Sequence, residues 1–192
     1  MAGMVYGCRS DYRPTHPVSF ADLNWRVPNL VRHMAFVVQH RPHLAVAPDV
    51  LSLDALPETL AYADRLAEHA QRVIIVPKAP GIVAQLPEWV IIGYSVPTRY
   101  GAADPLLLYE VGDRPVHLLG GSPMAQLTLA HYLNIYSADG NMIQLDARYG
   151  VWFDGSHWRT RDAGVPMGPD LYYRAFARSC QEVVAAWTRL AA

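Results

Sequence analysis

Short apolar segments alternate with helical or polar segments along most of the chain. Continuous apolar runs are typical of strands buried on both faces, and their alternation with helices indicates a parallel sheet. A closed eight-stranded (β/α) barrel takes about 250 residues, whereas this chain has 192. The sequence therefore predicts an α/β fold with a mostly parallel sheet, either an open doubly wound sheet or, as we favour, a compact or incomplete TIM-like barrel. We count six candidate strands: Met4–Gly7, Leu44–Val50, Val73–Val76, Trp89–Tyr94, Val116–Leu119 and Ile135–Ala138.

Helical periodicity marks three long segments: Phe20–Gln39, Pro57–Gln71 and Asp170–Leu190. Pro28 interrupts the first, so that helix is expected to begin near it. Shorter helices or turns are expected at Gly81–Leu86 and Asp104–Gly112 and a further helix after Pro123, with loops at Cys8–Pro17 and Asp154–Pro169. The residues expected on the buried side of the last helix are Leu171, Phe176, Val183, Val184 and Trp187.

Composition excludes several classes of protein. The formal net charge is −1 and 17% of residues are charged, so no overall basic field attracts nucleic acid. Cys8 and Cys180 do not have the spacing of a zinc site, and free thiols in a cytosol are expected. No signal peptide and no apolar run of transmembrane length are recognised. We therefore predict a single cytoplasmic α/β domain over residues 1–192, not associated with a membrane.

The stretch from Val116 to Phe153 carries the strongest local signals. An apolar strand ends in Gly120-Gly121, where backbone can approach another group closely. Ser122 and Pro123 then fit the cap and first position of a helix. A second strand ends at Asp139, which is followed by Gly140. Asp-Gly is also a common turn pair, so a plain turn is the alternative interpretation.

In a parallel sheet, polar residues that follow the strands gather at one edge, where active sites of α/β barrels lie. Asp11, Asp49, Lys78, the segment 93–99 and Asp139 are expected there. Carboxylates so placed suit acid–base or nucleophilic catalysis. Metal-ligand spacings such as DxD or HExxH are missing from the sequence, so no metal is predicted.

Each of these residues also has a structural interpretation. Asp49 and Lys78 could simply pair with each other. His117 lies inside an apolar strand, where a buried histidine that braces a neighbouring loop through a hydrogen bond is the expected case.

The same stretch resembles the tRNA-guanine transglycosylase family, and most closely its phage and bacterial relatives that insert 7-deazaguanines into DNA. The matching segments are HLLGGSP at residues 117–123, SADGN at residues 137–141 and Ala147-Arg148. The resemblance covers roughly residues 44–153. It implies that Asp139 is the nucleophile, which attacks the nucleoside C1′, displaces guanine and holds a covalent glycosyl-enzyme.

The resemblance also implies which residues bind the base. Asp49 matches the aspartate that reads the guanine edge, and Lys78 stands where the family has a glutamine. The family's Asp-Ser-Gly motif, which carries the general base, is missing from this sequence; Asp11 is the best-placed substitute and Asp22 the second. The zinc-binding Cys/His cluster of the family is missing too, so no structural zinc is expected. The other implied substrate-binding residues are Gly93, Tyr94, Ser95, Gly120, Gly121 and Asn141.

The expected activity is exchange of guanine in DNA, or less favourably in tRNA, for a 7-deazaguanine such as preQ0 or preQ1, without a cofactor. The resemblance also implies a homodimer, located in the host cytoplasm if the source is a phage. The alternatives are an N-glycosidic hydrolase with water as acceptor and a catalytically inactive barrel that binds nucleic acid. The arginines considered for phosphate contacts are Arg9, Arg13, Arg99, Arg148, Arg159 and Arg161.

Overall fold

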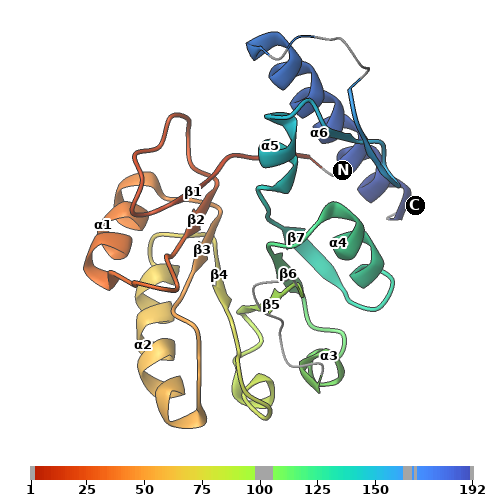
Figure 1. The fold of residues 1–192 in the computed structure, drawn as a ribbon. Helices are drawn as coiled ribbons and strands as arrows, with labels where there is room; N and C mark the ends of the chain where they lie inside the picture. The colour runs from red at the N-terminus through yellow and green to blue at the C-terminus, as the bar shows by residue number, and fades with distance from the viewer. Residues whose placement is uncertain (1–2, 98–105, 162–165, 167, 191–192) are drawn as a thin grey trace.

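The computed structural model describes residues 3–97, 106–161, 166 and 168–190. Seven parallel strands pair in chain order and curl into a half-barrel flanked by helices (Figure 1). The predicted α/β class and the incomplete TIM-like barrel are confirmed. The strands of this sheet are β1 (Gly7–Arg9), β2 (Phe20–Asp22), β3 (Leu44–Val46), β4 (Arg72–Ile75), β5 (Ile91–Ser95), β6 (Val116–Leu119) and β7 (Ile135–Ala138).

Strand β2 corrects the predicted count of six strands. Its Ala21 pairs with Cys8 of β1 and Ala45 of β3, although the segment from Phe20 was expected to be helical. Helix α1 (Leu30–His40) starts only after Pro28, where the side chain of Asn29 accepts a hydrogen bond from the Arg32 backbone N at 2.9 Å. The apolar residues before Pro28 therefore share helical spacing without belonging to the helix.

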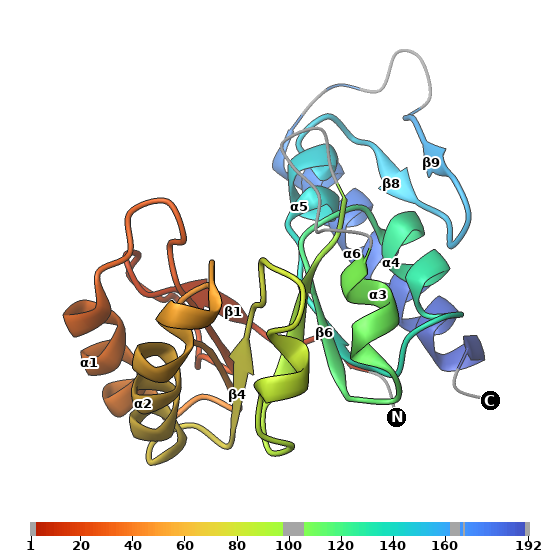
Figure 2. The same ribbon diagram turned by 90° about the horizontal axis from the view of Figure 1, so that it is seen from below.

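Helices α1 to α4 follow β2, β3, β5 and β6 and cover the outer face of the curved sheet, while α5, α6 and a small hairpin lie beyond β7 (Figure 2). Helix α5 and the hairpin were not predicted, because a polar turn and a loop were expected there. The remaining elements are α2 (Leu56–Ala67), α3 (Leu106–Val111), α4 (Pro123–Leu129), α5 (Met142–Ala147), α6 (Pro169–Leu190), β8 (Trp152–Phe153), β9 (Trp158–Arg159) and the short 3-10 helices Leu53–Ala55 and Val83–Gln85.

The sheet is apolar on both faces, which explains its continuous apolar runs. Its outer face packs against the helices in the main core, which contains Ala21, Ala45, Tyr62, Leu66 and Leu118. The concave inner face carries a second apolar cluster of Phe20, Leu44, Val46, Ile74, Val76 and Ile91, with Leu119 packed against it.

Two contacts across the half-barrel join strands that are not neighbours in the sheet. The rings of Phe20 on β2 and His117 on β6 lie 5.0 Å apart, centroid to centroid. Nearby, His43, which directly precedes β3, places its Nε2 2.7 Å from the hydroxyl of Tyr136 on β7, and the two rings stack. These contacts link the two halves of the curved sheet.

Helix α6 packs through smaller residues than its sequence predicts. Its buried residues are Ala175, Ser179 and Ala186, whereas the five larger side chains expected to be buried are only partly so. The Ser179 hydroxyl accepts a hydrogen bond from the backbone N of Phe153 at 3.0 Å. Small residues allow the helix to approach β8 this closely, and the larger ones surround the contact.

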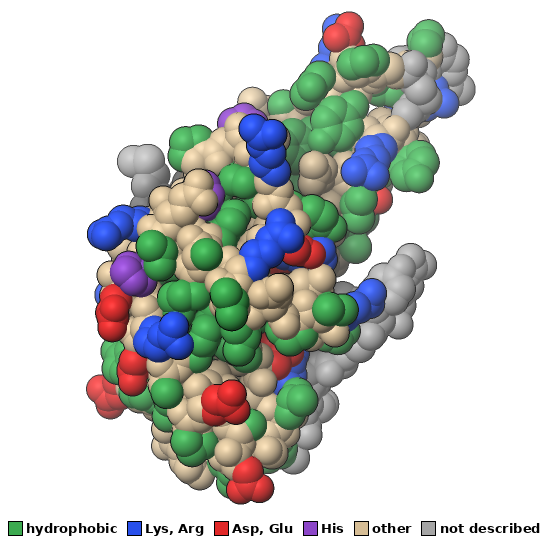
Figure 3. Space-filling view, turned by 90° about the vertical axis from the view of Figure 1, so that its left-hand side faces the viewer, with side chains coloured by type: hydrophobic (Ala, Val, Ile, Leu, Met, Phe, Trp, Pro, Cys, Tyr) green, Lys and Arg blue, Asp and Glu red, His purple; other side chains and the backbone are tan. Residues whose placement is uncertain are grey.

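The outer surface of α1 and α2 carries exposed apolar side chains, among them Val31, which is 83% exposed, and Val38 (Figure 3). A groove of about 850 Å³ runs between these helices and reaches Asp49. Among the described helices, none is both long and apolar enough to cross a membrane.

Candidate active site

Asp139 follows β7 directly and is fixed to the neighbouring strand end. Its backbone N donates to the carbonyl of Leu118 at 2.9 Å, and its Oδ1 accepts a hydrogen bond from the Gly120 backbone N at 2.9 Å. The side-chain amide of Gln126 on α4 donates to the carbonyl oxygens of Gly120 and Asp139, at 2.7 and 2.6 Å. Sequence reasoning missed Gln126, although its place one turn into the helix after Gly-Gly was visible. The three residues thus form one rigid unit.

The Gly-Gly turn needs glycine for two different reasons. Gly120 and Gly121 have φ values of +66° and +81°, a region that L side chains rarely adopt. A Cβ atom on Gly121 would also lie 2.3 Å from Cγ1 of Val96, whereas one on Gly120 would meet no atom within 4 Å. The Ser122 hydroxyl caps α4 by accepting from the Ala125 backbone N at 3.2 Å, as predicted.

His117 lies beneath Asp139 and is 1% exposed. Its Nδ1 is 2.7 Å from the Ser137 hydroxyl, and its Nε2 is 3.5 Å from Oδ1 of Asp139. If the Ser137 hydroxyl donates to Nδ1, the proton of the neutral ring sits on Nε2 and points toward Asp139. His117 is therefore a buried histidine, as its apolar strand suggested, but one directed at the candidate nucleophile.

Asp22 is the second carboxyl group at this place. It shares the inner face of β2 with Phe20, because alternate residues of a strand face the same side. Burial, and next the charge of Asp139, raise the pKa of Asp22 to about 7. A carboxyl group whose pKa is raised toward neutral pH by burial and by the charge of a second carboxyl group is a common arrangement at catalytic sites.

Asp11, expected as the general base, has a different environment. Arg9 donates to both of its carboxylate oxygens, at 2.8 and 2.6 Å, and Asn24 donates to Oδ2 at 3.2 Å. The hydrogen bond from Arg9 lowers the pKa of Asp11. Asp22, the second choice, thus lies close enough to Asp139 to be affected by its charge, while Asp11 is held in an ion pair.

Asp49, Lys78 and Ser95 come together at the carboxyl ends of β3, β4 and β5. Lys78 Nζ lies 3.2 Å from Oδ2 of Asp49 and donates to the Ser95 hydroxyl at 2.7 Å. Burial raises the pKa of Asp49 even though the charge of Lys78 acts to lower it. Asp49 and Lys78 therefore pair with each other, as the structural interpretation of these two residues expected.

Two predicted base-binding residues do not present a side chain to the inner face. Tyr94 is 3% exposed and packs in the outer core, so its side chain is directed away from the inner face. Gly93 faces inward, but a Cβ there would meet Val76, Ile74 and Leu119 within about 3 Å, so these side chains already cover it. Asn141 is exposed at the start of α5, without a capping hydrogen bond from its side chain.

The predicted nucleic-acid contacts lie on the α5 and hairpin side of the molecule. Arg148 and Arg161 are exposed. Arg159 is exposed too, but its Nε donates to Asp154. Hydrogen bonds from the backbone of His157 and Ser156, more than this ion pair, hold the pKa of Asp154 well below its usual range. Arg99 lies outside the residues that the structure describes.

The described parts of the chain contain no candidate metal site. No group of three or more His, Cys, Asp or Glu side chains there could hold a metal ion. Cys8 and Cys180 are both free thiols.

The fold and this site define an α/β half-barrel protein with two carboxyl groups, from Asp22 and Asp139, at the carboxyl ends of its strands. A family model with the description "Family of unknown function (DUF6610)" matches residues 1–188, and the chain belongs to that family. No curated protein matches the chain.

Proposed function

We propose that this protein is a base-exchange transglycosylase that replaces guanine in a nucleic acid with a 7-deazaguanine such as preQ0 or preQ1. The observation that carries the proposal is the place of Asp22 on the inner face, close enough to Asp139 for the charge of one carboxyl group to act on the other. Two carboxyl groups at one place, of which one can carry a proton near neutral pH, can supply both an acid and a nucleophile, as retaining glycosidases require. The motif that resembles the transglycosylases adds support, because it assigns the nucleophile to the same Asp139.

In the first half-reaction, Asp139 attacks C1′ as the bond from C1′ to the guanine nitrogen breaks. Oδ1 of Asp139 is occupied by the Gly120 N–H, so Oδ2 is the attacking atom. The proton of Asp22 passes to the departing guanine, which leaves as a neutral base. The carboxylate beneath C1′ stabilises the positive charge that develops there.

In the second half-reaction, the nitrogen of the incoming deazaguanine attacks C1′ and the bond to Asp139 breaks. The proton lost by that nitrogen returns to Asp22, so the enzyme regains its initial state. Nε2 of His117 lies 3.5 Å from Oδ1 of Asp139, and we assign His117 a positioning role, since it is buried.

DNA is the favoured polymer, as the resemblance to the deazaguanine-inserting relatives implies. A base in a duplex has to be flipped out to reach the inner face, so single-stranded substrates should react more readily. The homodimer, the cytoplasmic location and the phosphate contacts of Arg148, Arg159 and Arg161 belong to this proposal.

One observation favours the alternative of N-glycosidic hydrolysis. Asp49, expected to read the guanine edge, is instead paired with Lys78, so the purine-specific contact of the transglycosylases is changed. The non-enzymatic alternative predicts carboxylates withdrawn into ion pairs. That holds for Asp11 and Asp49, but Asp22 and Asp139 form no ion pair with Lys or Arg within the described residues.

The test is incorporation of radiolabelled guanine or preQ0 into DNA and into tRNA. We compare the wild type with Asp139→Asn, which keeps an acceptor for the Gly120 N–H, and with Asp22→Asn. The exposed Asp64→Asn is the matched control. Loss of incorporation in both site variants, with Asp64→Asn active, supports the proposal. Release of guanine without incorporation supports hydrolysis, and no reaction of the wild type with either polymer overturns the enzymatic proposals.

A further inference from the structure

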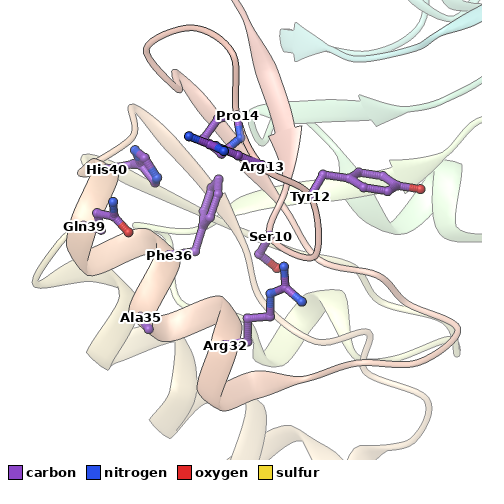
Figure 4. Close-up of a pocket in the computed structure, with 9 residues that line it drawn as sticks. All are labelled: Ser10, Tyr12, Arg13, Pro14, Arg32, Ala35, Phe36, Gln39 and His40. Carbon is purple, nitrogen blue, oxygen red and sulfur yellow. The ribbon is translucent and has the colours of Figure 1, made fainter.

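A cavity of about 450 Å³ lies outside the half-barrel, between the loop after β1 and helix α1 (Figure 4). Arg13 enters it from the loop and Arg32 from the helix, with the ring of Phe36 between them. His40 lines the cavity from the next turn of α1, with its ring centroid 4.5 Å from that of Phe36. Three nitrogen-rich side chains from two separate elements therefore share one cavity.

The charge of this cavity is not balanced by the protein. None of its lining residues is Asp or Glu, and neither Arg13 nor Arg32 forms an ion pair with a carboxylate in the part of the chain that the structure describes. The nearest carboxylate in sequence, Asp11, is already held by Arg9 and Asn24. Arg32 uses one donor on the carbonyl oxygen of Asp11 at 2.8 Å, which orients its guanidinium and leaves the other donors unused.

The chemistry of the lining selects a class of ligand. Two guanidinium groups match a doubly charged, multidentate anion better than a single carboxylate, and guanidinium is the preferred partner of phosphate. The Ser10 hydroxyl and the Gln39 amide add neutral hydrogen-bonding groups at the wall. The apolar surfaces of Phe36 and Pro14 suit the carbon skeleton of an ester. A phosphate ester fits these features together.

We propose that this cavity is a binding site for the phosphate group of a nucleotide, held mainly by Arg13 and Arg32. The backbone N of Ser10 in its wall donates to the carbonyl of Asp22 at 3.0 Å, so the cavity is anchored to the strand that carries the candidate acid. The phosphate can belong to a free nucleotide or to a polynucleotide. Only binding of a polynucleotide rests on the proposed function. In that case, the substrate strand would lie across the edge of the half-barrel.

The test measures binding and does not depend on turnover. The probes are GMP and a single-stranded oligodeoxynucleotide of about 12 nucleotides that lacks a terminal phosphate. The variants are Arg13→Gln, Arg32→Gln and their combination. Arg72→Gln is the matched control. Arg72 is exposed at the first position of β4 and does not line the cavity, and the substitution removes the same charge. Arg13→Lys tests whether charge alone suffices.

We expect Arg13→Gln and Arg32→Gln each to weaken the binding of GMP or of the oligonucleotide about tenfold. Arg72→Gln should leave the binding of both probes unchanged. If the oligonucleotide is the ligand, the double variant should also lower the slope of log affinity against log salt by about one to two. Weaker binding of GMP alone identifies a free nucleotide as the source. Equal binding of both probes by wild type and double variant, or no binding of either by the wild type, overturns the proposal, whatever the exchange assay shows.

Discussion

His117 Nε2 lies 3.5 Å from Oδ1 of Asp139 and forms no hydrogen bond with any of the described residues. The opposite ring nitrogen is held by the Ser137 hydroxyl at 2.7 Å. A buried ring nitrogen without a hydrogen bond lowers the stability of the folded protein. Such a nitrogen is therefore expected where its interaction with the nearby carboxylate contributes to function. The pair therefore connects the packing of the inner face with the chemistry proposed for Asp139.

The first prediction concerns His117. His117→Phe preserves the ring that packs on Phe20 but removes both polar atoms. We expect a loss of stability of about 1–2 kcal/mol, because Ser137 is left without its partner. We also expect a fall of about tenfold in the exchange rate at saturating substrate. Urea unfolding and the exchange assay measure the two effects.

Ser137→Ala is the matched variant for His117. It leaves the imidazole in place but frees its orientation, so a smaller effect on rate is expected at a similar cost in stability. Equal exchange rates in the wild type and His117→Phe would contradict the positioning role.

The second prediction follows from the raised pKa of Asp22. The pKa is about 7 in the folded protein and ordinary in the unfolded chain, so the folded state retains a proton that the unfolded state has already lost. Its contribution to stability is complete below about pH 4 and is lost as the pH rises through about 7. The whole shift corresponds to about 4 kcal/mol, an upper bound because Asp22 is only partly buried.

Asp22→Asn removes this dependence. The difference in unfolding free energy between variant and wild type should grow in favour of the variant from pH 5 to pH 8, while Asp64→Asn shows no such trend. Because the charge of Asp139 contributes to the shift, Asp139→Asn should lower the pKa of Asp22, which carboxyl-carbon NMR titration can follow. Parallel stability curves for the wild type and Asp22→Asn would refute the assignment.

The third prediction compares the two glycines of the turn. Gly120→Ala meets no atom, so only its left-handed backbone opposes the substitution, at about 1–2 kcal/mol. Gly121→Ala adds the clash with Val96, and we expect a total of about 2–5 kcal/mol. Thermal unfolding measures both.

Val96→Ala in the Gly121→Ala background should recover only part of the steric loss, because it removes Cγ1 but keeps the Cβ of residue 96, which lies 2.7 Å from a Cβ on Gly121. It should recover none of the backbone part. A cost for Gly120→Ala as large as that for Gly121→Ala would show that close packing against Val96 does not matter.

The fourth prediction concerns the pair formed by Asp49 and Lys78. Lys78→Met removes the positive charge that stabilises a partly buried carboxylate and should cost about 1–3 kcal/mol above neutral pH. The double variant Asp49→Asn, Lys78→Met should cost less than the sum of the single changes, because neither charge is left unpaired. Additive costs in the double-mutant cycle would indicate that the two groups do not interact.

The fold could be predicted from sequence because its strands are buried on both faces. Val73–Val76 is apolar throughout, and Val116–Leu119 is apolar apart from His117. Such runs flanked by Pro and Gly leave few other structures. Strand β2 could not be recognised, since its three residues continue into an apolar pattern with helical spacing that Pro28 ends. Helix α5 was missed because the segment 142–147 is short and follows a sequence typical of a turn.

The sequence predicts those residues of the site that directly follow a recognisable strand. Asp139, Asp49 and Lys78 each follow a recognisable strand, so their common edge could be deduced. Asp22 was ranked below Asp11 because its strand was not recognised, and nothing in the sequence indicated that Arg9 would hold Asp11. The buried relation of His117 to Asp139 depends on the register of β6 and β7, which only the structure provides.

The order of the strands has a consequence for how the chain acquires its shape. Each strand of the main sheet pairs only with its neighbours in sequence, so during synthesis every new strand can be added to an edge that already exists. The contacts of Phe20 with His117 and of His43 with Tyr136 join distant parts of the chain, and they cannot form until β6 and β7 have emerged. We therefore expect the sheet to grow first and to gain its curvature, and with it the proximity of Asp22 to Asp139, in the last steps of folding.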